Sequence, residues 1–140
     1  MRDRRIPWPL LLMLLISLVA LPAGAGNTAK ALSARDFKTM LDAHQDDSGL
    51  QLLDIRTPGE FNREHIRGAL LIDYYASDFV ARIKSLDRQK TYLVYCRSGN
   101  RSGRSLAVFQ RLGFTHVYHL ETGLIGWSRE NLPLIRPSGS

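Results

Sequence analysis

The sequence predicts an α/β fold: one domain in which a mainly parallel sheet carries helices on both faces. Short runs of apolar, aromatic and β-branched residues, typical of buried strands, alternate with segments whose apolar residues recur at helical spacing. This alternation favours crossover connections, which leave neighbouring strands parallel. The chain has 140 residues and no internal repeat or low-complexity segment, which argues for a single domain.

The first elements are indicated by composition and by capping residues. An edge strand is expected within residues 27–32, and Ser33 then caps a helix that ends near His44. Further strands are expected over residues 50–55 and 70–72, which are both rich in apolar residues. Each of these strands is bounded by polar or glycine-containing turns.

A short helix is expected directly after the second strand. Thr57 is placed to cap it, with Pro58 at its first position and Glu60 at its third. At the end of the strand before it, Asp54 and Arg56 are expected to form a local ion pair that fixes the strand end.

The second half continues the alternation. Its predicted elements are a helix over residues 78–86, a strand over 92–95, a helix over 105–112, a strand over 117–120 and a helix over 124–131. Gly113 ends the second of these helices. Trp127 in the last helix is expected to lie in the core, and an apolar wall beside the loop at Cys96 is the alternative. The tail from Pro137 is expected to be mobile.

Residues 1–25 have the composition of a secretory signal peptide. Residues 1–5 are net basic, an apolar stretch follows, and Ala23 and Ala25 are placed as an Ala-x-Ala cleavage site. This order predicts export to a bacterial periplasm and a mature domain over residues 26–140. The alternative is an uncleaved membrane anchor, although the apolar run of twelve residues is shorter than the roughly 20 that span a bilayer.

The charge is moderately basic, with 19 Lys and Arg against 13 Asp and Glu. Without residues 1–25, which hold three arginines and one aspartate, 16 basic residues face 12 acidic ones. No cluster of Lys and Arg follows residue 5, so nucleic acid is not an expected partner. A mildly basic surface favours small anionic ligands.

The one cysteine, Cys96, is the candidate nucleophile. It follows the strand over residues 92–95 and opens a polar loop, residues 96–101, ahead of a helix. Loop amides and a helix N-terminus stabilise a thiolate, and Arg97 and Arg101 add positive charge. A single cysteine cannot form an internal disulfide, so it is a free thiol. The alternative is a buried structural cysteine, which the polar surroundings argue against.

Four motifs, in this order, resemble those of single-domain rhodaneses of the exported bacterial type, a family of thiosulfate sulfurtransferases. They cover residues 53–61, 65–69, 94–102 and 123–127, and the whole resemblance extends over about residues 31–134. Two departures are visible: Thr122 replaces the first of two glycines, and residues 70–73 lack a proline common in the family. Both concern local loop shape.

The resemblance implies a rhodanese-like fold with a five-stranded sheet and a Cys96 that carries sulfane sulfur as a persulfide. It implies thiosulfate or a similar small anionic donor, a thiophilic acceptor such as cyanide or a thiol, and neither metal nor organic cofactor. The ping-pong kinetics of covalent catalysis are expected. The candidate substrate-binding residues are Arg97, Ser98, Gly99, Asn100, Arg101 and Ser102.

These loop residues have separate expected tasks. The amides of residues 97–102 surround the sulfur as an anion nest, and Gly99 allows the backbone conformation that this requires. Arg97 and Arg101 are candidates to bind the donor and the leaving sulfite. For Arg101, an ion pair with an acid such as Asp54 or Glu60 is an equal alternative.

The same residues bear on three other functions. A cysteine phosphatase has five residues between its cysteine and its arginine, whereas here the arginine is Arg101 and Ser102 holds the phosphatase position. A redox role is disfavoured because the sequence has no second cysteine that could act as a resolving thiol. A non-catalytic sulfur carrier or partner-binding module stays open as the alternative. His65 is expected to form structural hydrogen bonds instead of acting as an acid or base.

Overall fold

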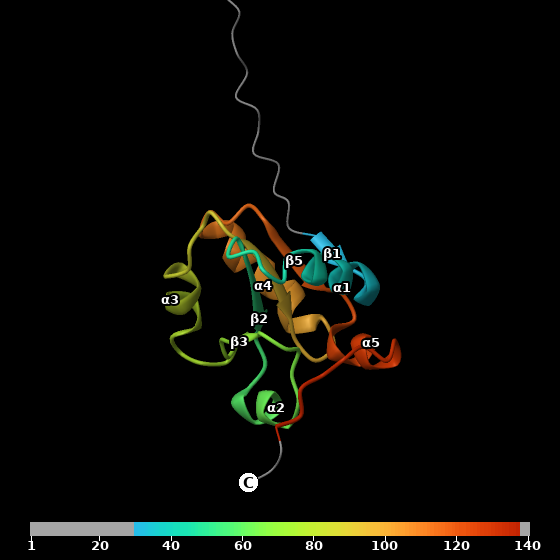
Figure 1. Ribbon diagram of the computed structural model, residues 1–140. Helices are drawn as coiled ribbons and strands as arrows, with labels where there is room; N and C mark the ends of the chain where they lie inside the picture. Colours follow the sequence, from blue (N-terminus) through green and yellow to red (C-terminus); the bar gives the residue numbers. More distant parts are fainter. Residues whose placement is uncertain (1–29, 138–140) are drawn as a thin grey trace, which may run out of the picture.

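The computed structural model describes residues 30–137, so the predicted signal peptide and its cleavage site lie outside the described residues. Within this range five strands form one fully parallel sheet, in the order β1-β5-β4-β2-β3 (Figure 1). The strands are β1 (Lys30–Leu32), β2 (Leu50–Asp54), β3 (Leu70–Leu71), β4 (Thr91–Tyr95) and β5 (Val117–Leu120). The predicted α/β fold with a parallel five-stranded sheet is confirmed.

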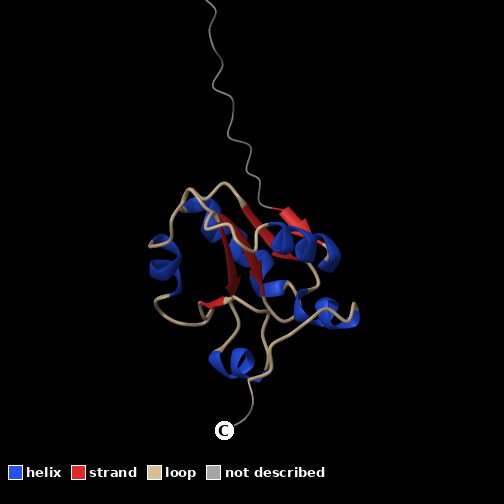
Figure 2. Ribbon diagram, viewed as in Figure 1, coloured by secondary structure: helices blue, strands red, loops and turns tan. Residues whose placement is uncertain are grey.

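Five helices alternate with the strands in the described chain (Figure 2). They are α1 (Ala34–Ala43), α2 (Pro58–Arg63), α3 (Phe79–Lys84), α4 (Asn100–Arg111) and α5 (Gly123–Arg129). The Ser33 side chain accepts a hydrogen bond from the amide of Asp36 and so caps α1. Thr57 and Glu60 form a complete capping box at the start of α2, with Pro58 in the first turn. Both predicted caps are confirmed.

Two apolar clusters hold the layers together, one on each face of the sheet. Phe79 and Ile83 of α3 and Phe109 of α4 pack against one face, together with residues of β2 and β4. Phe37 of α1 and Trp127 of α5 pack against the other face. Helices therefore cover both faces, as the sequence predicted.

Trp127 is a core residue. Its ring has no exposed surface and meets the ring of Phe37 edge-on, with 6.2 Å between centroids. Its indole Nε1 donates a hydrogen bond to the carbonyl of Pro133 at 3.0 Å. Cys96 belongs to the cluster on the opposite face, so the core role of Trp127 is confirmed and the wall role is not.

The start of α4 differs from the prediction. The helix begins at Asn100, five residues before the apolar spacing that starts at Ser105, so Asn100, Arg101 and Ser102 belong to its first turn and not to a loop. This turn faces a sulfur atom and solvent instead of the apolar core. Its residues are therefore polar, and hydrophobic periodicity cannot detect it.

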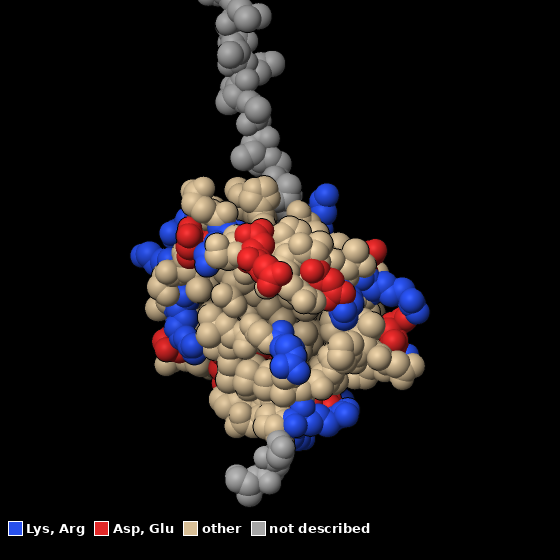
Figure 3. Space-filling model, viewed as in Figure 1, with Lys and Arg blue, Asp and Glu red and all other residues tan. Residues whose placement is uncertain are grey.

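Basic and acidic side chains are interspersed over the surface seen in Figure 3, and no continuous basic stripe crosses that face. No helix within residues 30–137 is long and apolar enough to cross a membrane.

Candidate active site

Cys96 lies at the carboxyl end of β4, directly after Tyr95. The carboxyl ends of β2 and β5 flank it, because both strands are parallel neighbours of β4. In open parallel sheets this edge is where ligands bind. Residues 97–99 then lead from Cys96 into α4, so the helix N-terminus points at the cysteine.

The sulfur of Cys96 is surrounded by hydrogen-bond donors. The amide of Gly99 lies 3.2 Å from Sγ and the amide of Ser102 lies 3.4 Å from it. The hydroxyl of Ser102 lies 3.5 Å from Sγ. Two amides, a hydroxyl and the positive end of α4 therefore converge on one sulfur atom, an arrangement that stabilises negative charge.

Cys96 is nevertheless fully buried, with no exposed surface. The side chain packs within the apolar cluster that includes Phe109 of α4, while its sulfur faces the amides. A structural cysteine is buried as well, so burial by itself does not distinguish the two roles. The converging donors do, because a thiol that only fills space does not need them.

The loop holds this shape through close backbone contacts with the turn between β5 and α5. Gly99 has a φ of 90°, and a Cβ there would lie 1.8 Å from the carbonyl oxygen of Glu121. Gly123 has a φ of 58°, and a Cβ there would lie 2.4 Å from the carbonyl of Arg97. A side chain fits at neither position.

Main-chain hydrogen bonds from α5 complete the attachment. The amide of Leu124 donates to the carbonyl of Cys96 at 2.9 Å, and that of Ile125 donates to the carbonyl of Arg97 at 3.0 Å. These carbonyls point toward α5, while the amides of Gly99 and Ser102 point toward the sulfur. Thr122, one departure from the family pattern, fits here because its Oγ1 occupies the space that a Cβ at Gly126 would need.

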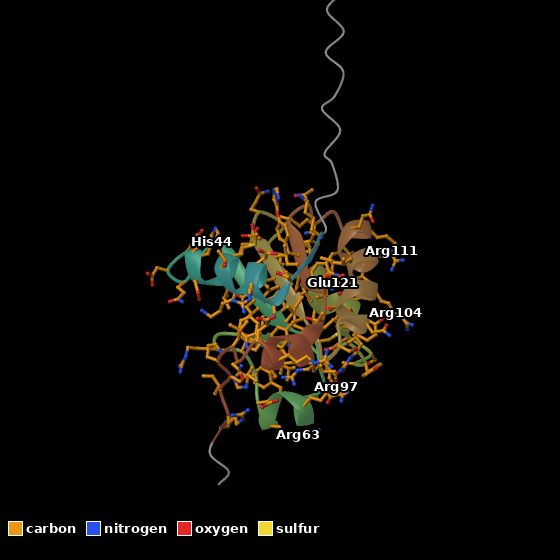
Figure 4. The ribbon with its side chains drawn as sticks, turned by 90° about the vertical axis from the view of Figure 1, so that its right-hand side faces the viewer. His44, Arg63, Arg97, Arg104, Arg111 and Glu121 are labelled. Carbon is orange, nitrogen blue, oxygen red and sulfur yellow. The ribbon has the colours of Figure 1, made fainter. Side chains whose placement is uncertain are left out.

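Three of the predicted loop residues are exposed: Arg97, Ser98 and Asn100. Arg97 lines a hollow of about 440 Å³. The other lining residues are Arg56, Glu60, Arg63, Glu64, Leu124, Ile125 and Ser128. Arg97 and Arg63 lie at the end of the molecule that carries α2, whereas Arg104 and Arg111 lie along α4 (Figure 4).

Arg101 forms an ion pair, the second of its two predicted roles. Its two terminal nitrogens each donate to one oxygen of Glu60 at 2.8 Å, and both side chains are largely buried. The bonds from Arg101 lower the pKa of Glu60 to about 2, against an opposing effect of burial, and Thr57 adds further hydrogen bonds. The pair connects α2 to the first turn of α4.

The predicted pair of Asp54 and Arg56 is confirmed. The guanidinium donates from Nε and Nη2 to the Asp54 carboxylate, with a shortest distance of 2.7 Å, and Nη2 also donates to the carbonyl of Glu64. Burial opposes the charge of Arg56, but the bonds with Asp54 outweigh it and raise the pKa of the guanidinium.

His65 makes the structural contacts expected of it: a 3.0 Å hydrogen bond with the carbonyl of Phe61 and a stacked contact with the Phe61 ring.

One neighbour of the site was not anticipated from the sequence. His119 of β5 places Nδ1 3.1 Å from the hydroxyl of Ser102. It lies 23 positions after Cys96, in a stretch with the composition of an ordinary strand, so no motif indicates it. Only the pairing of β4 with β5 brings it to the site.

Residues 33–130 match the family of rhodanese-like domains. The chain belongs to this family. A sulfurtransferase of Allochromatium vinosum is 31% identical to the rhodanese-like chain over 104 residues, which are 74% of this chain and 95% of that protein. The thiosulfate sulfurtransferase GlpE of Pseudomonas aeruginosa is 37% identical over 82 residues, which cover 58% of this chain and 72% of GlpE.

Other relatives are longer than this rhodanese-like chain. It spans 28% of the length of the probable adenylyltransferase/sulfurtransferase MoeZ of Mycobacterium tuberculosis, to which it is 31% identical over 114 residues, 81% of this chain. Among solved structures, a rhodanese-related protein of Thermoplasma volcanium matches with a TM-score of 0.63 and 27% identity. That match covers 76% of this chain and 97% of the other.

Proposed function

We propose that this rhodanese-like domain is a sulfurtransferase that moves sulfane sulfur from thiosulfate, or a similar anionic donor, to a thiophilic acceptor. The observation that carries the proposal is the surroundings of the Cys96 sulfur. Two amides and the Ser102 hydroxyl converge on Sγ at a helix N-terminus. The names of the two relatives described as sulfurtransferases support the same activity.

The reaction proceeds in two half-reactions through a Cys96 persulfide. The thiolate attacks the outer sulfur of thiosulfate, a new S–S bond forms, and the old S–S bond breaks as its electron pair leaves with sulfite. An acceptor, such as cyanide or a thiolate, then attacks the outer persulfide sulfur. The electron pair of the persulfide bond returns to Cys96, which regenerates the thiolate.

Arg97 is the proposed contact for the anionic donor. It is exposed, directly follows the cysteine, and lines the hollow of about 440 Å³ beside the loop. Glu60, which lines this hollow, engages Arg101, so Arg101 supplies positive potential toward Cys96 instead of contacting the donor. Ser98 and Asn100 are also exposed, on the outer side of the loop.

The position of Ser102 argues against phosphatase chemistry. A phosphatase needs a bidentate guanidinium at this place to wrap a phosphate. Ser102 is instead a buried residue whose hydroxyl lies beside the sulfur. The loop therefore encloses a single anionic sulfur atom better than a phosphate group.

Sulfur transfer is tested with purified protein, thiosulfate and cyanide. We expect turnover with ping-pong kinetics, a mass gain of one sulfur on Cys96 after incubation with donor, and loss of both in Cys96→Ser. Arg97→Ala should raise the donor KM about tenfold, since it removes one charge-assisted contact. Arg104→Ala, an exposed arginine further along α4, is the matched control and should leave KM unchanged. Absence of sulfur on Cys96 with every donor refutes the proposal.

The complete burial of Cys96 favours a second candidate, a non-catalytic module that carries sulfur or binds a partner. Stable sulfur loading without turnover toward any acceptor identifies this case.

For localisation, we propose that residues 1–25 direct export to the periplasm. Mass spectrometry of the exported protein tests both the cleavage after Ala25 and the sulfur load.

A further inference from the structure

Three side chains from different elements form a continuous polar chain that begins at the nucleophile. Sγ of Cys96 lies 3.5 Å from Oγ of Ser102, which lies 3.1 Å from Nδ1 of His119. Cys96 and Ser102 have no exposed surface, whereas His119 keeps 8% of its surface exposed. The thiol therefore has no direct contact with water, but it is connected through Ser102 to His119, which is partly exposed to solvent.

The fold makes room for this histidine between β5 and α4. Val117, two residues before His119 on β5, belongs to the apolar cluster on the α4 face, so His119 points to the same face. Gly103 of α4 faces the ring, and a Cβ there would lie 3.3 Å from Cε1, closer than most real contacts. The absence of a side chain at Gly103 lets the imidazole reach Ser102.

The protonation states of Cys96 and His119 are linked through the Ser102 hydroxyl. The Ser102 hydroxyl has one proton and three neighbours: the sulfur, Nδ1 of His119, and the carbonyl of Gly99 at 3.2 Å. A neutral imidazole carries its proton on only one nitrogen. If Nδ1 carries it, Nδ1 donates to Oγ and the hydroxyl proton is free to stabilise a thiolate. If Nε2 carries it, Nδ1 accepts the hydroxyl proton, and Oγ can accept from a thiol.

We propose that Ser102 and His119 form a proton relay that connects the buried Cys96 thiol to solvent and then holds the Ser102 hydroxyl as a donor to the thiolate. The thiol proton passes to Oγ as the hydroxyl proton passes to Nδ1, and the Nε2 proton leaves to water. One proton is thereby lost from the site, and His119 changes from its Nε2–H to its Nδ1–H tautomer. The inference rests on the proposed function, in which the thiolate is the attacking species.

The surroundings of His119 suit this role. Burial lowers the pKa of His119, which keeps the ring neutral near neutral pH, while the negative charge of Glu121 acts in the opposite sense. On the thiol side, Arg101 lies close enough to Cys96 for a Coulombic interaction. Within residues 30–137, every buried side-chain nitrogen or oxygen has a hydrogen-bond partner. Nε2 of His119 makes no hydrogen bond in this range, so it is not a buried atom. The exposed part of the ring therefore includes Nε2.

The test follows the rate of Cys96 alkylation by iodoacetamide against pH in the full chain. The pH of half-maximal rate reports thiolate formation, and scaling to the plateau removes differences in access. We expect this midpoint to rise by about one pH unit in Ser102→Ala and His119→Leu, with about tenfold slower alkylation below it, because one charge-assisted bond is lost. His119→Asn, whose amide nitrogen lies as far from Cβ as Nδ1 does, should restore the midpoint. His44→Leu, at the end of α1, is the matched control and should not move it.

A second measurement reads the tautomer directly. Nitrogen NMR of the unmodified chain, with His119 assigned from the His119→Asn spectrum, should show the proton moving from Nε2 to Nδ1 at the alkylation midpoint. The change should disappear in Cys96→Ser. Unchanged midpoints in both Ser102→Ala and His119→Leu, or a constant tautomer across the midpoint, overturn the relay. Should His119→Leu fail to fold, Ser102→Ala and the NMR titration decide the question.

These outcomes are independent of sulfur transfer, since alkylation uses no sulfur donor. A chain that shows the midpoint shifts but never carries sulfur on Cys96 refutes the proposed function and leaves the relay intact. A chain that transfers sulfur with unshifted midpoints refutes the relay alone.

Discussion

Replacing Glu60 by glutamine separates the two roles that the sequence left open for Arg101. The substitution keeps the shape of the side chain and removes its charge, so Arg101 loses its bidentate partner. If Arg101 is held as a structural ion pair, stability should fall and donor binding should change little. If Arg101 binds the donor, releasing it should leave donor affinity unchanged or improved, and removing it should weaken affinity strongly.

The size of the effect follows from the pKa of Glu60. A reduction of the pKa from 4.5 to about 2 corresponds to about 3–4 kcal/mol as an upper limit, at about 1.4 kcal/mol per pKa unit. The side chains of Arg101 and Glu60 are 14% and 18% exposed, so solvent screening reduces the interaction. We therefore expect a coupling free energy of about 1–2 kcal/mol between Glu60 and Arg101. A loss of stability of that size in Glu60→Gln corresponds to a melting temperature lower by about 4–16 °C.

The assay is a double-mutant cycle of Glu60→Gln and Arg101→Gln, followed by urea unfolding and by the donor KM. Glu64→Gln is the matched control, because its partner Arg136 is 73% exposed and such pairs contribute little. A coupling free energy within about 0.5 kcal/mol of zero refutes the structural role. So does a large rise in donor KM in Arg101→Gln when Glu60→Gln leaves KM unchanged.

Three further predictions concern the same edge of the sheet. The pKa of Glu60 is depressed, so its contribution to stability should be complete above pH 4.5 and lost as the pH falls toward 2; urea unfolding across this range should show a slope that Glu60→Gln lacks. Asp54→Asn leaves the buried charge of Arg56 without its carboxylate partner. The free energy of unfolding, measured by urea titration, should fall by about 3–5 kcal/mol, and a loss below about 1 kcal/mol would contradict a buried ion pair. Gly99→Ala should distort the loop, because the new Cβ would meet the carbonyl of Glu121. Sulfur loading of Cys96 should be lost while the circular dichroism spectrum stays native. Wild-type loading would contradict the arrangement of loop amides around the sulfur.

Most of the fold was predictable because it depends on local patterns. The alternation of apolar strands with helical spacing indicated a parallel sheet, and the capping residues Ser33 and Thr57 marked helix starts within a residue. The first turn of α4 was missed because a turn that faces sulfur and solvent has no apolar spacing. Short β3, of two residues, was predicted one residue too long.

The site was predictable only in part, because its residues come together through tertiary contacts. The donors around Cys96, loop amides at a helix N-terminus, could be anticipated from the residue types. The partner of Arg101 was not, since Asp54 and Glu60 were both plausible from the sequence, and the choice depends on Asp54 being engaged by Arg56. His119 was invisible because β-strand pairing, which no local pattern encodes, places it beside Ser102.

The main-chain attachment of residues 96–97 to α5 has a consequence for how this domain can change. The peptide groups of Cys96 and Arg97 are held by amides of Leu124 and Ile125, and no loop side chain takes part in those two bonds. The outward side chains of Arg97, Ser98 and Asn100 are therefore free to vary without displacing the sulfur. In the proposed sulfurtransferase, donor preference would therefore depend on these outward side chains, and thiol reactivity would depend on the main-chain cradle beneath them.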